Sequence, residues 1–468
     1  MVTLEIDHSL VKIKGASQEA IKAIGEVARY RPKDFMFSKK YKEGKWDGWI
    51  RLLKKAPTYY YLPAGLLFLV RRALDEIGES YVLQDTRNKG LLGNRARWSW
   101  ISPKPLRDYQ IGAVEAGVRK SRGIWELATG SGKMLTAAKF FQTLGLPGII
   151  TVLTEEAVRD TSRELEESIG GARIGRWYKD EKSTGDIVVT TIPSLHAEIK
   201  KKHSRLKDHF ERTEVLIMDE AHMMAADTYY EVMQKSKAYY KIGQTGTPYR
   251  SDGKDLLLLA CTGRVMIQKK AKELQEEGIL SQAKIVFYHS PPPAHLSIEA
   301  LAERSPKDRY MDSIVYNEPR NRLISELYHS QEVQTAVIVK YIEHGEILAD
   351  IIGIPFVSSK VRNRAEIQSG LNDGSLLGVV ATTIFDMSVN IPGLTRIINA
   401  AGHSPEARQT QRLGRVIRLF DGKEWAYFYD FMDDWDNKAW LHSRNRLKYM
   451  KSEGHEVEIK TPELEYFS

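Results

Sequence analysis

The sequence predicts an α/β protein with two lobes, each a parallel sheet with crossover helices, preceded by a small α+β domain. From Leu106 onward, short apolar runs rich in β-branched residues alternate with longer amphipathic stretches, the pattern of parallel strands joined by helices. These runs form two series, which a charged stretch at residues 269–277 separates. The first 100 residues lack this alternation, which indicates a separate small domain.

The two series predict the positions of individual strands. The first predicts strands at 148–153, 186–191, 215–218 and 241–244, with a helix at 155–169, and the second predicts strands at 336–339, 378–381, 396–399 and 426–430. Prolines at 291–293 predict a loop. We expect domains at 1–100, 101–265 and 266–435, and a C-terminal extension at 436–468 that packs on the second lobe. Within the first domain we expect helices at 17–29 and 66–77 and a hairpin at 41–53 with its turn near Glu43 and Gly44.

Composition excludes several classes of protein. Of the 468 residues 42% are hydrophobic, which is enough for several cores. Cys261 is the only cysteine, so the chain has neither an internal disulfide framework nor a cysteine zinc site, and we expect this thiol to be packed. The longest apolar run, at 66–70, is far shorter than the roughly 20 residues that span a membrane, and no signal pattern opens the sequence. We expect no membrane partner and a cytoplasmic location, the host cytoplasm if a bacteriophage encodes the chain.

The positive charge is concentrated near the N-terminus. Residues 1–100 hold 19 Lys and Arg against 11 Asp and Glu, and this excess of eight equals the net charge of the whole chain. Lys and Arg bind a phosphate backbone through counterion release, while aromatic rings stack on bases or brace basic side chains. The candidates for nucleic-acid binding are Lys39, Lys40, Lys42, Lys45, Trp46 and Arg51. The alternative is an ordinary solvated basic face.

A glycine-rich turn follows a short apolar stretch and opens a predicted helix. It consists of Thr129-Gly130-Ser131-Gly132-Lys133. Glycines let the backbone N–H groups and the helix N-terminus point at phosphate oxygens, and the lysine reaches the β- and γ-phosphates. Alone, such a sequence is often only a tight turn.

Two carboxylates at the end of a predicted buried strand strengthen this interpretation. Asp219 and Glu220 follow residues 215–218, at the end of a strand where parallel α/β sheets hold their ligands. Asp219 is the candidate Mg²⁺ ligand, and Glu220 is the candidate for orienting the attacking water. With Lys133 they predict hydrolysis of ATP. A later acidic cluster, Asp430, Asp433, Asp434 and Asp436, is expected to cap the next helix rather than to bind a metal.

Met134 departs from the phosphate-loop pattern. The residue after the lysine normally offers a hydroxyl to Mg²⁺, and a thioether is a poor ligand for that hard cation. Thr136 is turned about 200° away on a helix and is not expected to substitute for it. Our hypothesis is that water fills the position and Asp219 carries more of the metal binding. The alternative is a site that binds ATP but hydrolyses it feebly.

Five signatures in this order resemble those of the superfamily 2 helicases, over residues 104–430. They are Arg107-Asp108-Tyr109-Gln110, the Lys133 loop, Asp219-Glu220-Ala221-His222, Thr245-Gly246-Thr247-Pro248 and the run from Gln411 to Arg418. The resemblance implies two RecA-like lobes, ATP and Mg²⁺ as cofactors, and a cycle in which the lobes alternately grip a nucleic-acid strand.

The resemblance also implies roles for single residues. The nucleotide-binding set is Arg107, Gln110, Thr129, Gly130, Ser131, Gly132, Lys133 and Met134, with the first two on adenine. The catalytic set is Lys133, Asp219, Glu220, Gln411, Arg415 and Arg418, and the set that couples the lobes is His222, Thr245 and Thr247. The alternative for the run from Gln411 to Arg418 is an amphipathic helix with exposed arginines.

Hydroxyl groups at predicted strand ends are candidates for contacts with the nucleic-acid backbone, because they suit phosphate oxygens. These residues are Thr154, Thr190, Thr191 and Ser194 in the first lobe and Ser358, Thr382 and Thr383 in the second. Taken singly, each is equally the kind of residue that caps a helix or forms a turn. The stretch at 381–392 resembles a helicase motif but has Ser388 in place of a glycine and Asn390 in place of an acid.

Residues 41–52 and 62–66 resemble the N-terminal domain of UvsW-like bacteriophage helicases. That resemblance implies remodelling of branched DNA, such as junction migration, fork regression and R-loop unwinding, by a monomer that also works with replication or recombination proteins. Three alternatives remain. They are an RNA helicase, a restriction-type translocase with only Glu458 and Lys460 as a hint of a nuclease, and a nucleotide-gated DNA clamp, which Met134 favours.

Overall fold

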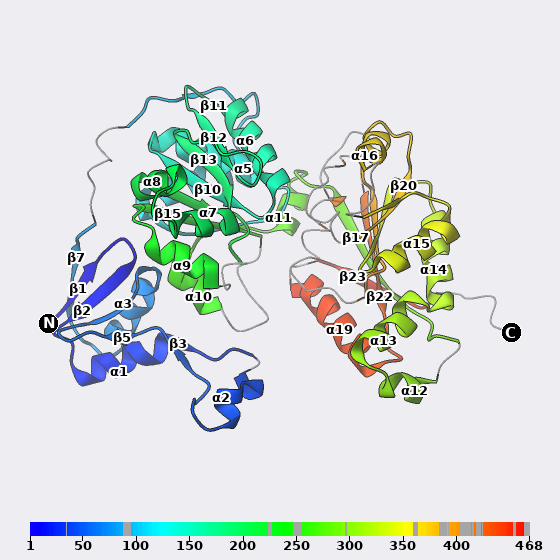
Figure 1. Cartoon of the computed structure of the whole chain (residues 1–468), viewed down its shortest axis with the longest axis horizontal. Helices are drawn as coiled ribbons and strands as arrows, with labels where there is room; N and C mark the ends of the chain where they lie inside the picture. Colours follow the sequence, from blue (N-terminus) through cyan, green and yellow to red (C-terminus); the bar gives the residue numbers. More distant parts are fainter. Residues whose placement is uncertain are drawn as a thin grey trace. The chain divides into compact units, whose positions relative to one another are not determined.

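The structure of the chain is a computed structural model that describes residues 1–33, 35–87, 95–222, 227–246, 255–294, 297–358, 364–382, 391, 393–402, 413, 416–417, 423, 425–452 and 455–462. The chain folds into two compact units (Figure 1). One comprises Met1–Ala128 and Gly132–Lys269, and it contains the N-terminal domain and the first lobe. The other is made mainly of Lys270–Ser468 and contains the second lobe.

The N-terminal domain is a five-stranded sheet of order β5-β6-β2-β1-β7 with helices α1 and α3. Buried and less buried residues alternate along β1 and β2, so this sheet has one face in the core. The elements are β1 Val2–Ile6, β2 Leu10–Lys14, α1 Gln18–Val27, β3 Arg29–Tyr30, η1 Phe35–Phe37, α2 Lys39–Lys42, β4 Ile50–Arg51, β5 Lys54–Lys55, β6 Tyr60–Pro63, η2 Ala64–Leu66, α3 Leu67–Glu76 and β7 Tyr81–Asp85.

The predicted hairpin at 41–53 is wrong. Lys39–Lys42 form a short helix after Ser38, and β4 pairs with β3, at residues 29–30, rather than with a strand across the expected turn. Trp49, whose position suggested an alternating strand, lies against the guanidinium groups of Arg29 and Arg31, 4.2 and 4.5 Å from its ring. The aromatic residue that suggested alternation is thus held by arginines some 20 residues earlier in the chain, not by a hairpin partner.

The N-terminal domain shares a hydrophobic core with the first lobe. Leu257 and Ala260 of α10 (Asp255–Thr262) belong to the same buried cluster as Leu66 and Leu69. A Cβ added at Gly65 would clash with the carbonyl oxygen of Leu259, so the two backbones approach closely there. The domain and the first lobe are therefore one packed body rather than two modules on a linker.

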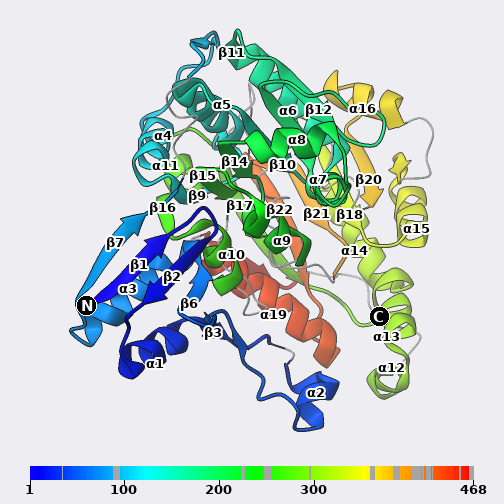
Figure 2. The ribbon, with the colours of Figure 1, turned by 60° about the vertical axis from the view of Figure 1, so that its left-hand side comes forward.

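The first lobe is a parallel seven-stranded sheet of order β12-β13-β10-β14-β15-β9-β16, with helices around it (Figure 2). Its central strands β10 and β14 are buried along their whole length, as parallel strands covered on both faces are. The elements are β8 Ser99–Trp100, α4 Asp108–Lys120, β9 Arg122–Leu127, α5 Lys133–Leu144, β10 Gly148–Val152, α6 Glu155–Ser168, β11 Ile169–Gly170, β12 Ile174–Trp177, β13 Ile187–Thr191, α7 Ile192–Ile199, α8 Arg205–Arg212, β14 Val215–Met218, α9 Asp227–Lys235, β15 Tyr240–Thr245 and β16 Val265–Lys269.

The second lobe is also a parallel seven-stranded sheet, of order β19-β20-β18-β21-β22-β17-β23. The predicted fold class, two parallel α/β lobes after a small α+β domain, is confirmed. The elements are α11 Ala271–Glu276, β17 Gln282–His289, α12 Ile298–Glu303, α13 Pro306–Tyr310, the π-helical turn η5 Met311–Val315, α14 Glu318–His329, β18 Thr335–Val339, α15 Ile342–Ile352, β19 Phe356–Val357, α16 Arg364–Asn372, β20 Gly378–Thr382, β21 Arg396–Asn399, β22 Trp425–Met432, α19 Asn437–Ser452 and β23 Val457–Lys460.

Two members of the acidic cluster, Asp430 within β22 and Asp433 just after it, form buried ion pairs. Asp430 accepts two hydrogen bonds from the buried guanidinium of Arg446, at 2.9 and 3.0 Å. Asp433 accepts one from the fully buried Arg320 at 3.0 Å. These two acids therefore compensate buried positive charge inside the lobe, while Asp436 directly precedes α19 and the expected cap of that helix stays a prediction.

The described part of the chain shows no candidate for a membrane span or for a cluster of metal ligands. No helix among the described residues is both long and apolar enough to cross a membrane. In the same part of the chain, no group of three or more His, Cys, Asp or Glu side chains is arranged to hold a metal ion.

Glu214, at the start of β14, makes the stability of the first lobe depend on pH. Burial raises the pKa of this carboxyl group from its usual value of 4.5 to about 7, and its Oε2 atom has no hydrogen-bond partner. Between these two pH values the folded chain binds more protons than the unfolded chain, so stability falls as the pH rises through this window.

We expect Glu214→Gln to remove this loss of stability. At pH 8 the variant should gain about 1–3 kcal/mol in its free energy of unfolding, and the gain should disappear near pH 4.5. Thermal unfolding at several pH values checks this, with the exposed Glu211→Gln as the control that leaves the pH dependence unchanged. The same gain at every pH would contradict burial of an ionised carboxylate as its cause.

Candidate nucleotide site and nucleic-acid surface

The carboxyl ends of three adjacent strands bring the predicted nucleotide-binding residues together. In the first sheet β15 lies between β9 and β14. The phosphate loop follows β9, the two acids follow β14, and the coupling motif begins at the end of β15. The spacing of about 86 residues between the loop and the acids therefore becomes a distance of two strands.

The phosphate loop has the backbone conformation that its glycines permit. Gly130 and Gly132 have φ angles of +83° and +79°, a region that side chains with a Cβ atom rarely adopt. Helix α5 begins directly afterwards at Lys133. Nζ of Lys133 lies 3.1 Å from Oε1 of Glu220, and both side chains are largely buried. The lysine and the acid of the two motifs thus form an ion pair.

Asp219 offers a carboxylate oxygen that suits a cation. Its backbone N–H donates to the carbonyl oxygen of Thr151 at 2.9 Å, which fixes the residue at the end of the sheet. Its Oδ1 atom is shielded from solvent and has no hydrogen-bond partner. Burial raises the pKa of this carboxyl group, although nearby Lys133 opposes the shift. A divalent cation would compensate both the burial and the missing partner.

Neither Met134 nor Thr136 supplies the hydroxyl that usually completes a magnesium site. Met134 packs against the hydrophobic core of the lobe. The hydroxyl of Thr136 donates to the carbonyl oxygen of Gly132 at 3.1 Å, within the helix, as its place two residues further on led us to expect. Asp219 therefore suits Mg²⁺, and water would take the ligand position that a hydroxyl of the phosphate loop usually fills.

Glu220 has a strained backbone. Its φ angle is +48°, a left-handed conformation that is uncommon for a residue with a Cβ atom. Such strain costs of order 1–3 kcal/mol and persists where the surroundings enforce it, commonly at functional sites. Here it follows a buried strand and turns the carboxylate toward Lys133.

Strand β15, the middle one of the three, is hydrogen bonded to the acidic motif on one side and to the phosphate-loop lysine on the other. Nδ1 of His222 lies 3.0 Å from Oγ1 of Thr245 and 3.3 Å from Oε2 of Glu220. On the other side Nε2 of Gln244 donates to the carbonyl oxygen of Lys133 at 3.0 Å. Sequence reasoning missed Gln244, although a buried amide directly before the coupling motif was a signal for it.

The adenine-recognition residues lie beside the phosphate loop. Oε1 of Gln110 accepts from the backbone N–H of Arg107 at 2.9 Å, and its Nε2 atom donates to the carbonyl oxygen of Gly132 at 3.3 Å. These bonds join the start of α4 to the loop. The predicted contact with adenine stays a prediction.

Several predicted site residues lie outside the described residues. They are Thr247, Thr383, Gln411, Arg415 and Arg418. Their roles in coupling, strand binding and catalysis stay predictions.

In the first lobe the predicted strand-contacting hydroxyls form hydrogen bonds within the protein. Thr154 caps α6 by accepting from the N–H of Ala157 at 3.1 Å, and Thr191 caps α7 and bonds Ser194 at 2.9 Å. Thr190 donates to the carbonyl oxygen of Trp177. The capping alternative is therefore correct for Thr154 and Thr191, and contact with a nucleic-acid backbone stays a prediction.

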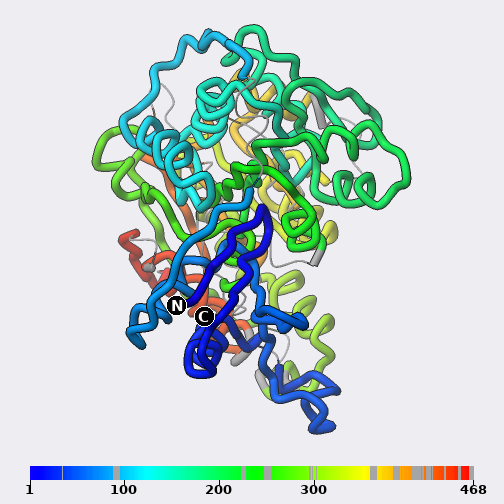
Figure 3. Tube along the Cα trace, turned by 90° about the vertical axis from the view of Figure 1, so that its left-hand side faces the viewer, coloured from blue at the N-terminus to red at the C-terminus, as the bar shows by residue number. Residues whose placement is uncertain are grey.

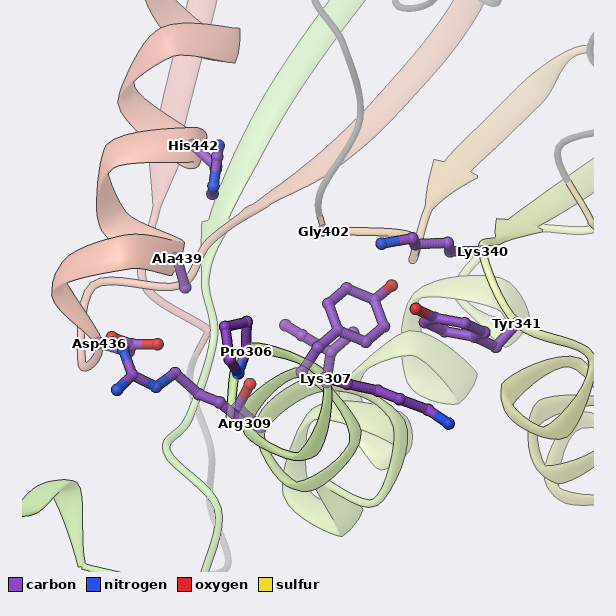
Figure 4. Close-up of a pocket in the computed structure, with 12 residues that line it drawn as sticks. Pro306, Lys307, Arg309, Lys340, Tyr341, Gly402, Asp436, Ala439 and His442 are labelled. Carbon is purple, nitrogen blue, oxygen red and sulfur yellow. Dashed lines mark ion pairs between the residues drawn. The ribbon is translucent and has the colours of Figure 1, made fainter. Parts of the chain in front are cut away.

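In the second lobe the hydroxyl candidates share a sheet edge with a cavity. Ser358 follows β19 and Thr382 ends β20, and both are buried, with no hydrogen-bond partner at Oγ1 of Thr382. A cavity of about 490 Å³ lies at the ends of β18, β21 and β22 in the same sheet (Figure 4). Among the residues that line it are Lys307, Arg309, Tyr310, Lys340, Tyr341 and His442.

Aromatic rings and basic groups meet in this cavity. Nζ of Lys340 lies 4.7 Å from the ring centre of Tyr310 and 5.1 Å from that of Tyr341. The two rings contact each other edge to face at 5.2 Å. Bases stack on rings and phosphates bind cations, so this lining suits a nucleotide unit of a single strand. Sequence reasoning missed it because its residues come from separate segments.

The basic candidates of the N-terminal domain surround α2. Lys39, Lys40 and Lys42 lie on the helix and are exposed, and Lys39 and Lys45 reach Glu43 at 3.8 and 2.9 Å. Two candidates have structural partners. Trp46 donates its indole N–H to the carbonyl oxygen of Trp49 at 2.8 Å, and Arg51 pairs with Asp47.

The arrangement in the first lobe suits phosphoryl transfer. Lys133 can exchange Glu220 for phosphate oxygens, and the carboxylate released by this exchange can accept a proton from water. When bound at Asp219, Mg²⁺ would neutralise charge on the phosphates. His222 lies between Glu220 and Thr245, so a change at the acid reaches β15.

Comparisons with known proteins agree with this chemistry. Residues 103–250 match the family described as "Type III restriction enzyme, res subunit", and residues 318–420 match the "Helicase conserved C-terminal domain". "Putative helicase 22" of Sulfolobus islandicus filamentous virus is 24% identical over 71% of this chain, which spans 65% of that relative's length. "ATP-dependent DNA helicase uvsW" of Enterobacteria phage T4 is 21% identical over 91% of this chain and 89% of its own.

A solved structure shows the same fold. The DNA-bound type ISP restriction-modification enzyme LlaBIII covers 85% of this chain and 36% of its own, with a TM-score of 0.58 and 14% identity. A res-subunit domain with a phosphate loop and paired acids, followed by a helicase C-terminal domain, has the parts of an ATP-driven helicase motor. The chain thus carries the domains of an ATP-dependent helicase, and its motifs are those that the superfamily 2 helicases share.

We expect Glu220→Gln to reduce ATP turnover by about a hundredfold or more while the protein still binds ATP. Lys133→Ala should lose turnover and bind nucleotide more weakly, because its phosphate-binding charge is gone. Turnover assays and titration with a fluorescent ATP analogue measure both effects, and thermal unfolding verifies the fold. The exposed Glu211→Gln is the matched control, and normal turnover in Glu220→Gln would refute its role.

The bond between His222 and Thr245 should couple hydrolysis to movement along the strand. We expect His222→Ala and Thr245→Val each to lower the number of base pairs opened per ATP hydrolysed, by about tenfold for a coupling of 1–3 kcal/mol. Because both changes remove one bond, the double variant should be no worse than either single variant. Additive losses would contradict a shared pathway.

Proposed function

We propose that this ATP-dependent helicase is a DNA helicase or translocase that remodels branched DNA. The observation that carries the proposal is the extent of its likeness to a phage ATP-dependent DNA helicase, which includes nearly the whole chain and thus the basic N-terminal domain. The sequence resemblance of residues 41–52 and 62–66 to UvsW-like helicases supports the same conclusion.

The attachment of the N-terminal domain supports a role in gripping DNA. Nζ of Lys241 donates to Oγ of Ser9 at 3.1 Å and to the carbonyl oxygens of Met233 and Ser236. Arg87 bonds the hydroxyl of Ser121 at 2.9 Å. With the shared core, these bonds let the domain transmit force between bound DNA and the first lobe.

In this proposal the second lobe binds a single strand along the carboxyl edge of its sheet. Thr382 and Ser358 end strands of the sheet that carries the basic and aromatic cavity, and Lys340 lies close to both of the cavity's tyrosines. Gln411, Arg415 and Arg418 complete the nucleotide site in the proposed cycle, as their motif implies. ATP drives the cycle through different affinities for its closed and open forms.

A nucleotide-gated DNA clamp is the second candidate function, and Met134 favours it. Neither Met134 nor Thr136 offers a hydroxyl to Mg²⁺, since the first packs in the core and the second bonds Gly132. A clamp would bind DNA in response to ATP but turn ATP over slowly, and DNA would not stimulate the turnover.

One experiment tests the proposed function directly. ATP turnover and strand separation are measured on forked DNA, a four-way junction, an R-loop, linear duplex DNA and duplex RNA at one ATP concentration. We expect the branched DNA substrates to be opened and to stimulate turnover most. Greatest activity on duplex RNA would favour an RNA helicase, and the absence of stimulation by any DNA would favour the clamp.

A variant of α2 tests whether this helix binds the phosphates of the same DNA substrates. We expect Lys39→Gln, Lys40→Gln and Lys42→Gln together to weaken junction binding and to lower the slope of log affinity against log salt by about 0.9 for each phosphate that the protein no longer neutralises. The matched control changes three exposed lysines of the first lobe, Lys104, Lys179 and Lys202, to Gln. An unchanged slope in the α2 variant would contradict the proposed grip.

A further inference from the structure

Met36 and Phe37 form an exposed apolar tip, which is surrounded by basic residues of the N-terminal domain. Met36 and Phe37 end the short helix η1 with 54% and 73% of their surfaces exposed. Among the described large hydrophobic residues, only Met1 is more exposed than Phe37. Figures 1 and 2 show α2, which closely follows η1 in the chain, projecting from the sheet of this domain, and the blue trace in Figure 3 projects in the same way. Burial of these side chains would be favourable, so their exposure requires an explanation.

The tip is carried by an ordered stem. The ring of Phe35 contacts Tyr41 edge to face at 4.8 Å, and the guanidinium of Arg31 lies 5.0 Å from it. The same guanidinium also lies over Trp49. Gly48, at a φ angle of +83°, lies so close that a Cβ atom would clash with Phe35. The stem thus holds Met36 and Phe37 outward at little further cost in conformational entropy on binding.

The charge around the tip indicates which partner it meets. Residues 29–55 contain ten Lys and Arg against three Asp and Glu. Lys39 and Lys40 follow the tip after Ser38, and Nζ of Lys42 lies 5.9 Å from the ring of Phe37. An apolar partner surface would leave these cations without counter-charges, whereas nucleic acid offers apolar base faces bordered by phosphates.

We propose that Phe37 and Met36 form a wedge that stacks on the base pair at a DNA branch point while the lysines of α2 hold the flanking phosphates. This inference rests on the proposed action on branched DNA and assigns the element that recognises the branch. Insertion of an apolar side chain into a continuous duplex costs a few kcal/mol of base stacking. At a branch a base-pair face is already partly unstacked, so the wedge favours branched over linear DNA.

The effects of the wedge and of the α2 lysines on DNA affinity can be measured separately. Phosphate contacts act on every DNA and depend on salt, whereas stacking acts only where a base face is available. Removal of the α2 lysines therefore lowers the affinity for junction and linear duplex together. Removal of the Phe37 ring lowers the ratio of junction to duplex affinity.

The test uses the full chain with Phe37→Ala, Phe37→Trp and Met36→Ala. A four-way junction and a linear duplex carry 2-aminopurine, at the branch and at the matched internal position. We expect Phe37→Ala to lower the ratio of junction to duplex affinity about tenfold and to abolish the change in 2-aminopurine fluorescence at the branch. Phe37→Trp should retain both, because indole also stacks, and Met36→Ala should have a smaller effect.

Leu83→Ala is the matched control, because Leu83 is an exposed apolar residue, 45% exposed, on β7 of the same domain. It should leave the affinity ratio and the fluorescence change as in the unaltered protein. An unaltered ratio in Phe37→Ala, or equal losses on junction and duplex, would overturn the wedge. A loss in Phe37→Trp equal to that in Phe37→Ala would also overturn it, since stacking would not then be the cause. If the unaltered protein acts on branched DNA but Phe37→Ala behaves identically, the wedge fails and the proposed function stands.

Discussion

The nucleotide site depends on the order of three parallel strands, β9, β15 and β14. Because β15 lies in the middle, its last residues reach both neighbours, Gln244 toward the backbone of Lys133 and Thr245 toward His222. The ion pair of Lys133 and Glu220 closes the same edge. Each of these buried charges compensates the other, and a phosphate must replace the carboxylate to bind. Nucleotide binding is thereby tied to a change at Glu220, the residue with the strained backbone.

Strand β15 also fixes the N-terminal domain, which lies outside the nucleotide site. Lys241, on β15, points to the start of the chain, where its ammonium group meets Ser9 and two carbonyl oxygens of the lobe. Burial lowers the pKa of this lysine well below its usual value. A buried amino group satisfied by three oxygens fixes the position of the domain, since a shift would leave it without partners. The strand that couples the motifs therefore also anchors the basic domain.

The sequence predicted the parts of the structure that depend on local pattern. The strand at 215–218 was predicted with its observed bounds because β14 is buried throughout and bordered by charged residues. The strand β17, which lies second from one edge of the second sheet, carries polar residues and was missed. The buried ion pair of Asp433 could not be predicted, because Arg320 lies 113 residues earlier in the chain. Likewise, the phosphate loop and paired acids form contiguous motifs, whereas Gln244, Lys340 and Phe37 gain their importance from tertiary neighbours or from exposure.

Rigid attachment and local recognition together suit a motor that acts at a branch. A basic domain on a flexible linker would follow the DNA without resisting it, because the linker would absorb the displacement. Here Gly65 lies against the backbone of α10, and Arg29, Arg31 and Trp49 brace the stem that carries Phe37. The path from β15 to the tip thus runs through packed groups. If the chain acts on branched DNA as proposed, these packed groups would pass a displacement of the first lobe on to the tip rather than absorb it.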